Sequence, residues 1–162
     1  IFVTMSAIIF IIIMLSTAFA MEFVAFLAHK YLMHGFLWGW HHDHHNPNDV
    51  EGFFEKNDLF FLIFAIPSFF CYFFGSLYNP ALFAIGVGIS IYGLIYFLIH
   101  DVYIHQRFRW FRQLDSKYSR AILRAHGAHH VKIGKDAGES FGLLIVHPKF
   151  FGKRKDWQEK ES

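Results

Sequence analysis

The sequence predicts an all-α membrane protein with three transmembrane helices and a cytoplasmic, histidine-rich helical cap; four spans are the alternative. Apolar residues make up 54% of the 162-residue chain, and charged residues make up only 17%. The apolar residues gather in long runs, whereas all 15 lysines and arginines and all 12 histidines lie between or after those runs. The length is that of one domain, so residues 1–162 are expected to form a single unit.

Residues 1–28 form the first predicted span, because a helix needs about 20 apolar residues to cross a bilayer core. The one ionisable side chain in this stretch is Glu22. A secretory signal peptide is the alternative, yet no lysine or arginine precedes the apolar residues and no clear cleavage site follows them. The segment is therefore expected to remain as a membrane helix.

A second apolar run covers residues 59–99 and has no Asp, Glu, Lys, Arg or His over 41 residues. It divides at Asn79-Pro80, a dipeptide typical of turns. Each part is long enough to cross a bilayer. The run therefore predicts two antiparallel helices, over residues 59–77 and 81–99.

The polar remainder is expected on one side of the membrane, with residues 29–58 and 100–150 as the cap and 151–162 as a solvated tail. The hairpin tip at Asn79 has no basic residue, whereas the opposite side carries all 15, so the positive-inside rule places the cap in the cytoplasm. Basic residues follow His105 too closely for a fourth span. They are mixed with acidic residues, and no nucleic-acid partner is expected.

Ten of the twelve histidines form four clusters, which alternate between H-x4-H and H-x2-H-H spacing. The clusters contain His29 and His34; His41, His44 and His45; His100 and His105; and His126, His129 and His130. The same two-part pattern thus follows each apolar block. His42 and His147 lie outside it and are expected to be ordinary interfacial or core residues.

The spacing of the clusters suits metal binding. On an α-helix, residues i, i+3 and i+4 share one face, so H-x2-H-H presents three imidazoles together. Residues five apart lie about 140° apart around the axis, so an H-x4-H pair brackets one site or serves two metals. Ten imidazoles exceed the four ligands of a tetrahedral zinc ion and match two metals with about five ligands each.

The residue types leave the metal open, because imidazole suits zinc, copper, iron and nickel alike. The chain lacks the Glu-x-x-His ligands of soluble carboxylate di-iron bundles and the H-E-x-x-H motif of zinc proteases. Its single cysteine, Cys71, cannot hold an iron–sulfur cluster or a cysteine zinc site.

Four stretches around the clusters resemble the bacterial β-carotene hydroxylases, within the membrane fatty acid hydroxylase superfamily of non-haem di-iron enzymes. These stretches are His29–Gly35, Trp38–His45, His100–Arg107 and Ala125–Gly142, and the resemblance covers nearly the whole chain. It implies two iron ions on the ten clustered histidines, dioxygen as a co-substrate and a location in the bacterial inner membrane. It also implies hydroxylation of β-ionone rings at carbon 3, from β-carotene through β-cryptoxanthin to zeaxanthin. Members are often drawn with four spans, one more than the apolar runs predict.

Hydroxylation with dioxygen consumes two electrons from outside the substrate. The chain has no G-x-G-x-x-G motif, no P-loop and no cysteine cluster to hold a redox cofactor. A ferredoxin-like protein or another reductase is therefore the expected electron donor.

Other functions stay open at this point. Within the enzyme class they are a carotenoid 4-ketolase and a fatty acyl hydroxylase or desaturase, since related enzymes carry similar histidine clusters. Outside it, a membrane metal-binding or transport protein is the alternative. Transporters typically place ligands near the midplane, however, and spans 59–77 and 81–99 contain no ionisable residue.

Three acidic residues near the clusters are candidate partners of the ligand rings. Glu22 lies seven residues before His29, almost on the same helical face, so it either hydrogen-bonds a ligand imidazole or lies near the membrane interface. Asp43 and Asp101 are also expected to hydrogen-bond rings. The aromatic residues expected at the membrane interface are Tyr31, Trp38 and Trp40.

Overall fold

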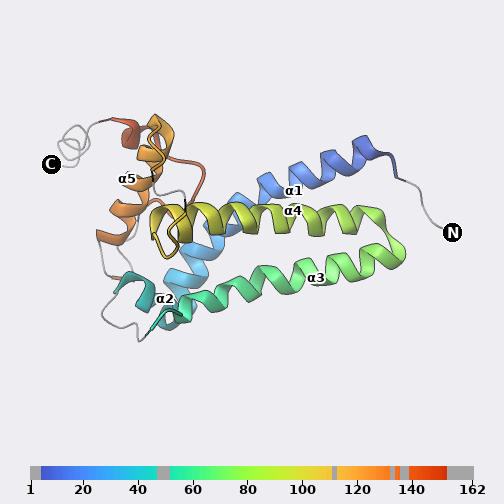
Figure 1. The fold of residues 1–162 in the computed structure, drawn as a ribbon. Coiled ribbons are helices and arrows are strands. Elements are labelled where there is room, and N and C mark those ends of the chain that lie inside the picture. Colours follow the sequence, from blue (N-terminus) through green and yellow to red (C-terminus); the bar gives the residue numbers. More distant parts are fainter. Residues whose placement is uncertain (1–4, 47–51, 111–112, 132–133, 136–138, 153–162) are drawn as a thin grey trace.

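Three long helices run side by side and carry shorter elements at one end (Figure 1). The computed structural model describes residues 5–46, 52–110, 113–131, 134–135 and 139–152. Its long helices are α1 (Ala7–Leu27), α3 (Phe60–Tyr78) and α4 (Pro80–Tyr96). Most of the predicted tail, residues 153–162, lies outside the described residues.

The predicted fold class and the three predicted spans are confirmed. The continuous helical stretches Ala7–Phe36, Lys56–Tyr78 and Pro80–Ile104 are long and apolar enough to cross a membrane, by length and composition. The described residues hold no fourth stretch of this kind and no strand.

The hairpin between α3 and α4 turns at the predicted dipeptide. Asn79 caps α4, because its Oδ1 atom accepts the Ala81 N–H at 2.9 Å. Pro80 occupies the first helical position, where its missing N–H has no partner to lose. Close to the turn the two backbones touch: a Cβ added to Gly75 would lie 2.3 Å from the Phe83 nitrogen. A glycine is required there for the close approach.

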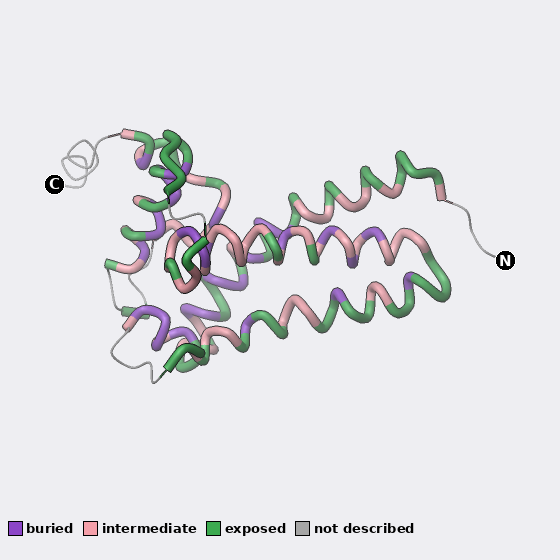
Figure 2. Tube along the Cα trace, in the orientation of Figure 1, coloured by how far each residue is buried: buried purple, intermediate pink, exposed green. Residues whose placement is uncertain are grey.

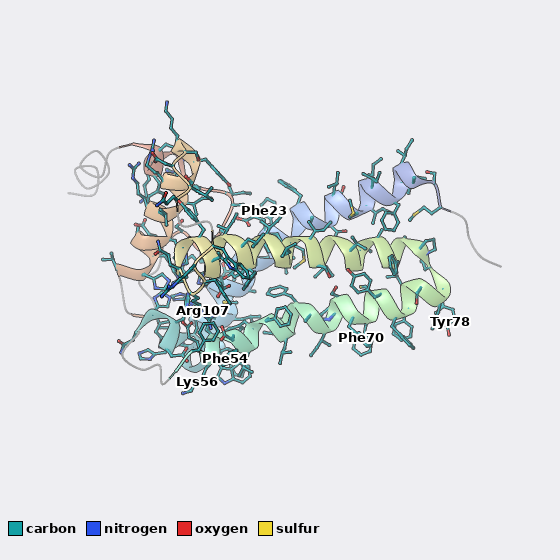
Figure 3. All side chains as sticks on the ribbon, in the orientation of Figure 1. Phe23, Phe54, Lys56, Phe70, Tyr78 and Arg107 are labelled. Carbon is teal, nitrogen blue, oxygen red and sulfur yellow. The ribbon has the colours of Figure 1, made fainter. Side chains whose placement is uncertain are left out.

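The second close contact joins α1 to α4. A Cβ added to Gly88 would lie 2.5 Å from the Met14 carbonyl oxygen, so these helices also cross backbone to backbone. Away from such contacts the helices expose large apolar side chains, as Phe70 and Tyr78 do on α3 (Figures 2 and 3). An apolar outer surface of this kind suits a lipid environment.

The cap is built from short elements and from extensions of the long helices. Buried residues gather where it meets the ends of the long helices (Figure 2). Its elements are the π-helices η1 (Ala28–Phe36) and η4 (Phe97–Ile104), the helices α2 (Trp38–His45) and α5 (Lys117–Val131), and the 3-10 turns η3 (Lys56–Leu59) and η5 (Pro148–Phe151).

Candidate metal centre

Nine of the ten clustered histidines meet in two groups at the base of the cap. The first histidine set consists of His29, His34, His41, His45 and His129. The second histidine set consists of His44, His100, His105 and His126. Within each set, one ring nitrogen per residue lies within 4.8 Å of all the others. Residues up to 100 positions apart thus converge, and the structure brings the predicted clusters together.

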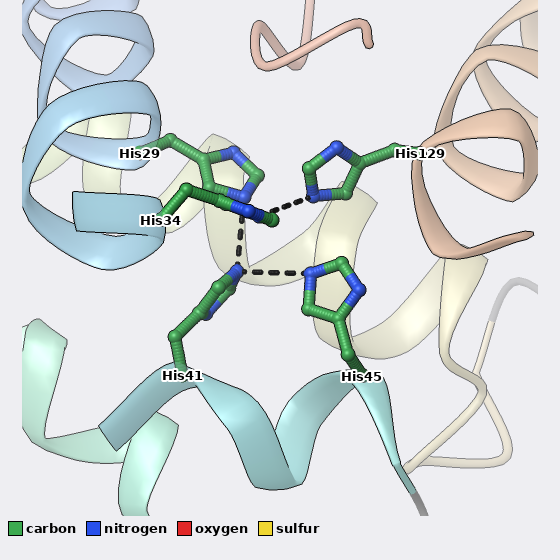
Figure 4. Close-up of side chains that lie close together, drawn as sticks. All are labelled: His29, His34, His41, His45 and His129. Atoms are coloured by element: carbon green, nitrogen blue, oxygen red, sulfur yellow. Dashed lines mark hydrogen bonds between the residues drawn. The ribbon is translucent and has the colours of Figure 1, made fainter. Parts of the chain in front are cut away.

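Helix α2 contributes rings to both sets. His41 and His45 point to the first set, as Figure 4 shows, whereas His44 points to the second. At about 100° per residue, His45 is rotated about 40° one way from His41 and His44 about 60° the other way. The three histidines of H-x2-H-H therefore lie on one side of the helix, as expected, but they serve two different sets. Helix α5 is divided in the same way, since His126 and His129 belong to different sets.

The H-x4-H pairs stay together because both lie on π-helices. A π-helix bonds residue i to residue i+5, which brings residues five apart onto adjacent turns of one face. The His105 N–H donates directly to the His100 carbonyl at 2.9 Å. The 140° separation calculated for a regular α-helix does not apply here, and each pair supplies a single set.

In four rings of the first set, the Nδ1–H group, which points away from the centre of the set, donates a hydrogen bond to a neutral oxygen. The Nδ1–H groups of His29, His34 and His129 donate to the carbonyls of Phe141 (2.9 Å), Lys135 (3.2 Å) and Glu139 (3.0 Å). His41 Nδ1 donates to the Asn57 side-chain oxygen at 2.6 Å. A carbonyl only accepts hydrogen bonds, so these partners place the proton on Nδ1 and leave Nε2 with a lone pair.

The Nε2 atoms, which point toward the centre of the set, consequently face one another with their lone pairs. The two Nε2 atoms of His34 and His129 lie 3.1 Å apart, as do those of His29 and His41 (Figure 4). Neutral rings in these tautomers have no proton to place between the two atoms. Burial keeps them neutral, because it lowers the pKa of His41 and of His129 to about 3. A bound cation would satisfy these facing lone pairs.

The spacing of the inner nitrogens fits such a cation. Imidazole nitrogens bind first-row metals at about 2.1 Å, which puts adjacent ligands about 3.0 to 3.4 Å apart. Within the second set, the Nε2 atoms of His44 and His100 lie 3.2 Å apart, inside this range, and those of His105 and His126 lie 2.8 Å apart, slightly below it. Both sets are therefore suited to hold one metal ion each.

Two carboxylates lie beside rings of the second set. His44 Nδ1 donates to Glu55 Oε2 at 2.7 Å. Asp101 lies beside His100, but its Oδ2 atom is 3.6 Å from Nδ1, outside hydrogen-bond distance, and its Oδ1 atom pairs with Arg107 at 3.0 Å. The hydrogen bond expected from Asp101 to a ring is therefore absent. Burial raises the pKa of Glu55 to about 7, against the opposing charge of Arg107.

His130, the tenth clustered histidine, lies between the two sets. Its ring centroid is 4.4 Å from that of His45 and 4.5 Å from that of His126. Its Nε2 atom is buried and has no hydrogen-bond partner among the described residues. Burial lowers the pKa of His130 to about 4, so the ring is neutral at neutral pH, and its Nδ1–H tautomer offers the Nε2 lone pair to a cation.

The other two histidines lie apart from both sets. His147 is exposed, and its Nδ1 atom accepts the Lys149 N–H at 3.2 Å. His42 packs its ring 5.4 Å from that of Trp38. Trp38 itself lies 5.1 Å from the ring of His34, so it packs against the first set.

Glu22 and Asp43 bind other groups than the expected imidazoles. Glu22 is 3% exposed and accepts the Tyr92 hydroxyl at 2.8 Å, together with three backbone N–H groups from Leu143 to Ile145. Asp43 accepts the Lys56 N–H at 2.6 Å. Each therefore holds a backbone segment.

The partners of the rings were missed in the sequence. Asn57 and Glu55 lie in a polar stretch before α3 with no spacing rule that connects them to a histidine. The remaining partners are backbone carbonyls, which carry no residue-type signal. Only the folded chain identifies them.

A cavity of about 850 Å³ leads from the histidines into the space between α3 and α4. Its polar end includes His29, His100 and His126. Most of its wall is apolar and comes from Phe, Leu, Ile and Met side chains of α1, α3 and α4. Phe54 and Arg107, which lie where the long helices meet the cap, also line the cavity (Figure 3). A long apolar molecule could reach both histidine sets through it.

The geometry agrees with comparisons to known proteins. The sequence model of the fatty acid hydroxylase family matches residues 14–152, which include every clustered histidine. The chain belongs to the fatty acid hydroxylase family. This membership confirms the family resemblance read from the histidine clusters.

Comparisons with individual relatives are more specific than the match to the family. The chain is 44% identical to a beta-carotene hydroxylase of Pantoea ananas, over 85% of this chain and 77% of the relative. It is 40% identical to a beta-carotene hydroxylase of a Paracoccus species, over 85% and 84% of the two chains. A chloroplastic beta-carotene 3-hydroxylase of Gentiana lutea is 38% identical over 79% of this chain, which spans 40% of that longer relative. No solved structure matches the chain.

Proposed function

We propose that this protein hydroxylates the β-ionone rings of β-carotene at carbon 3, giving β-cryptoxanthin and then zeaxanthin. The observation that carries the proposal is the 44% identity to a named beta-carotene hydroxylase across the histidine-bearing part of the chain. The name of the Gentiana relative supports carbon 3 as the position.

The cavity supports a lipid-soluble substrate. Its wall lies within the membrane-spanning helices and is mainly apolar, so a polyene would exchange contact with lipid for contact with aromatic and aliphatic side chains. One ring would lie beside His29, His100 and His126. Carbon 3 and carbon 4 are neighbours, so small displacements of the ring would decide between hydroxylase and ketolase products.

We further propose that two iron ions bind the ten clustered histidines. The first set would hold one ion, and the second set together with His130 would hold the other, five imidazoles in each case. When bound, the iron pair supplies the activation of dioxygen for C–H hydroxylation. The protein's own contribution is to keep the imidazoles neutral, fix their tautomers and exclude water around the ring.

Two further parts of the proposal concern the surroundings of the protein. The two electrons would come from a ferredoxin-like protein or another reductase that docks on the cap. The cap would face the cytoplasm of a bacterium, with the helices in the inner membrane. Reporter fusions after residues 50 and 160 should both be cytoplasmic, and a reporter inserted at Asn79 should be exported. An exported C-terminal reporter would overturn this orientation.

The reaction is tested by expression in cells that accumulate β-carotene, followed by chromatography of the pigments. Zeaxanthin and β-cryptoxanthin are the expected products, and a His129→Ala variant is the matched inactive control. Canthaxanthin would identify a 4-ketolase instead. Unchanged β-carotene with altered fatty acids would identify an acyl-chain enzyme.

A further inference from the structure

A short backbone segment, residues 139–145, passes over the first histidine set and is called the strap here. Two of its carbonyls hold ligand rings: Phe141 accepts His29 Nδ1–H at 2.9 Å, and Glu139 accepts His129 Nδ1–H at 3.0 Å. His29 belongs to the extension of α1 and His129 to α5. The strap therefore sets the orientation of two rings that approach from opposite sides (Figure 4).

One carboxylate, that of Glu22, holds the strap in place through hydrogen bonds. Glu22 Oε1 accepts the N–H groups of Leu143, Leu144 and Ile145 at 2.9, 2.7 and 2.9 Å. Its Oε2 atom accepts the Tyr92 hydroxyl at 2.8 Å, which ties α1 to α4 at the same point. Four donors thus converge on one buried carboxylate. An ionisable group within a membrane span is costly, and here the strap and Tyr92 compensate for it.

The strap has little freedom to adopt another path. Ser140, between the two ring-holding carbonyls, has a φ of 60°, in the left-handed region that residues other than glycine rarely adopt. Such strain persists only when neighbouring contacts hold the segment in place. Close packing adds to this, since a Cβ added to Gly142 would lie 3.1 Å from Glu22 Oε1.

We propose that Glu22 is a positioning residue for the first histidine set and acts through the strap. By fixing the amides of residues 143–145, it holds the Phe141 and Glu139 carbonyls where they keep the Nε2 atoms of His29 and His129 turned inward. Glu22 touches neither ring. Among the described residues, no ring of the second set hydrogen-bonds to the strap. The effect of Glu22 on ring orientation is therefore confined to the first set and its metal. This inference rests on the metal centre proposed above.

The test compares full-length variants purified in detergent and loaded with ferrous iron. Glu22→Met removes every acceptor at similar size, Glu22→Gln keeps an oxygen for the amides but removes the charge, and Tyr92→Phe removes only the contact with α4. Iron per chain and Mössbauer spectra are measured, with circular dichroism to verify folding. Neither readout depends on hydroxylation.

Glu22→Met is expected to lower iron from about two ions per chain to about one, with one Mössbauer component lost and the other unchanged. For Glu22→Gln we expect two ions, with affinity at one of them reduced about tenfold. Tyr92→Phe should resemble the wild type. Equal loss of both components from folded Glu22→Met or Glu22→Gln would overturn the proposal, and so would unchanged spectra in both. If Glu22→Met does not fold, Glu22→Gln alone decides. Wild-type protein that never holds two ions would instead contradict the proposed function.

Discussion

The Nδ1 atom of His44 lies 2.7 Å from the Oε2 atom of Glu55, and this partly buried pair distinguishes the second histidine set from the first. In the first set the outer partners of the rings are neutral carbonyl and amide oxygens. A carboxylate makes an imidazole a more basic ligand than a carbonyl does. A cation on Nε2 would in turn strengthen the Nδ1–H donor and favour the ionised form of Glu55. The two sets thus offer a metal unequal environments.

The carboxylate partner of His44 predicts that Glu55→Gln weakens metal binding at the second set. The variant keeps a hydrogen-bond acceptor for His44 but removes the charge, so metal affinity at the second set should fall about 10- to 100-fold. Competition with a chelator of known affinity measures the change. Asp115→Asn, at an exposed carboxylate paired with Arg120, is the matched control and should leave affinity unchanged. Equal affinities in Glu55→Gln and the wild type would show that the carboxylate charge does not contribute.

His130 and His147 provide a comparison between two histidines close in sequence. His130→Ala removes an imidazole whose buried Nε2 atom lies next to both sets, so we expect loss of one iron and of nearly all hydroxylation. His147→Ala removes an exposed acceptor of the Lys149 N–H and should cost at most about 1 kcal/mol of stability, with activity retained. Elemental analysis and pigment chromatography separate the two. A fully loaded, active His130→Ala protein would remove His130 from the metal centre.

The cavity can be narrowed from Gly93 without disturbing the backbone. A Cβ added there meets no atom within 4 Å, and the residue lines the cavity midway along its wall. In the series Gly93→Ala, Gly93→Leu and Gly93→Phe, hydroxylation of β-carotene should fall progressively while iron content stays constant. Increasing side-chain volume would occupy the space proposed for the polyene. Full activity of Gly93→Phe would place the substrate elsewhere.

Acid should destabilise the metal-free protein. Burial lowers the pKa of His41 and of His129 from 6.5 to about 3, so between these values the unfolded chain binds more protons than the folded one. Stability should therefore be greatest above pH 6.5 and fall on acidification, by roughly 2 kcal/mol per such histidine between pH 6.5 and 5. Thermal unfolding in detergent at several pH values measures this. Metal-loaded protein is the control and should resist acid further, because the metal occupies the lone pairs. Greater stability of the metal-free form at pH 5 than at pH 7 would contradict the assignment.

The arrangement of the spans could be predicted because it depends on local properties. The length of the apolar runs and the turn at Asn79-Pro80 are enough to define α3 and α4, and the confirmed bounds differ from the predicted ones by only a few residues. The histidine spacing likewise predicted a shared site. That these histidines bind iron stays a prediction, supported by the facing lone pairs.

The division into two sets could not be predicted, because it depends on helix type and helix placement. A regular α-helix separates His100 from His105, and only the π-helical extension of α4 brings them together. The placement of α2 against the other helices decides that His44 joins a different set from His41 and His45. Neither property can be read from spacing alone.

By itself, the sequence determined the spans and the residue types available for a metal, since hydropathy and spacing are properties of neighbouring residues. Only the tertiary structure decided which oxygen holds each ring and what Glu22 does. Several of those contacts join residues more than 100 positions apart, such as Glu22 with Leu144 and His29 with Phe141. Their partners are largely backbone groups, which are identical in every residue type and acquire a role only when the fold directs them toward a side chain.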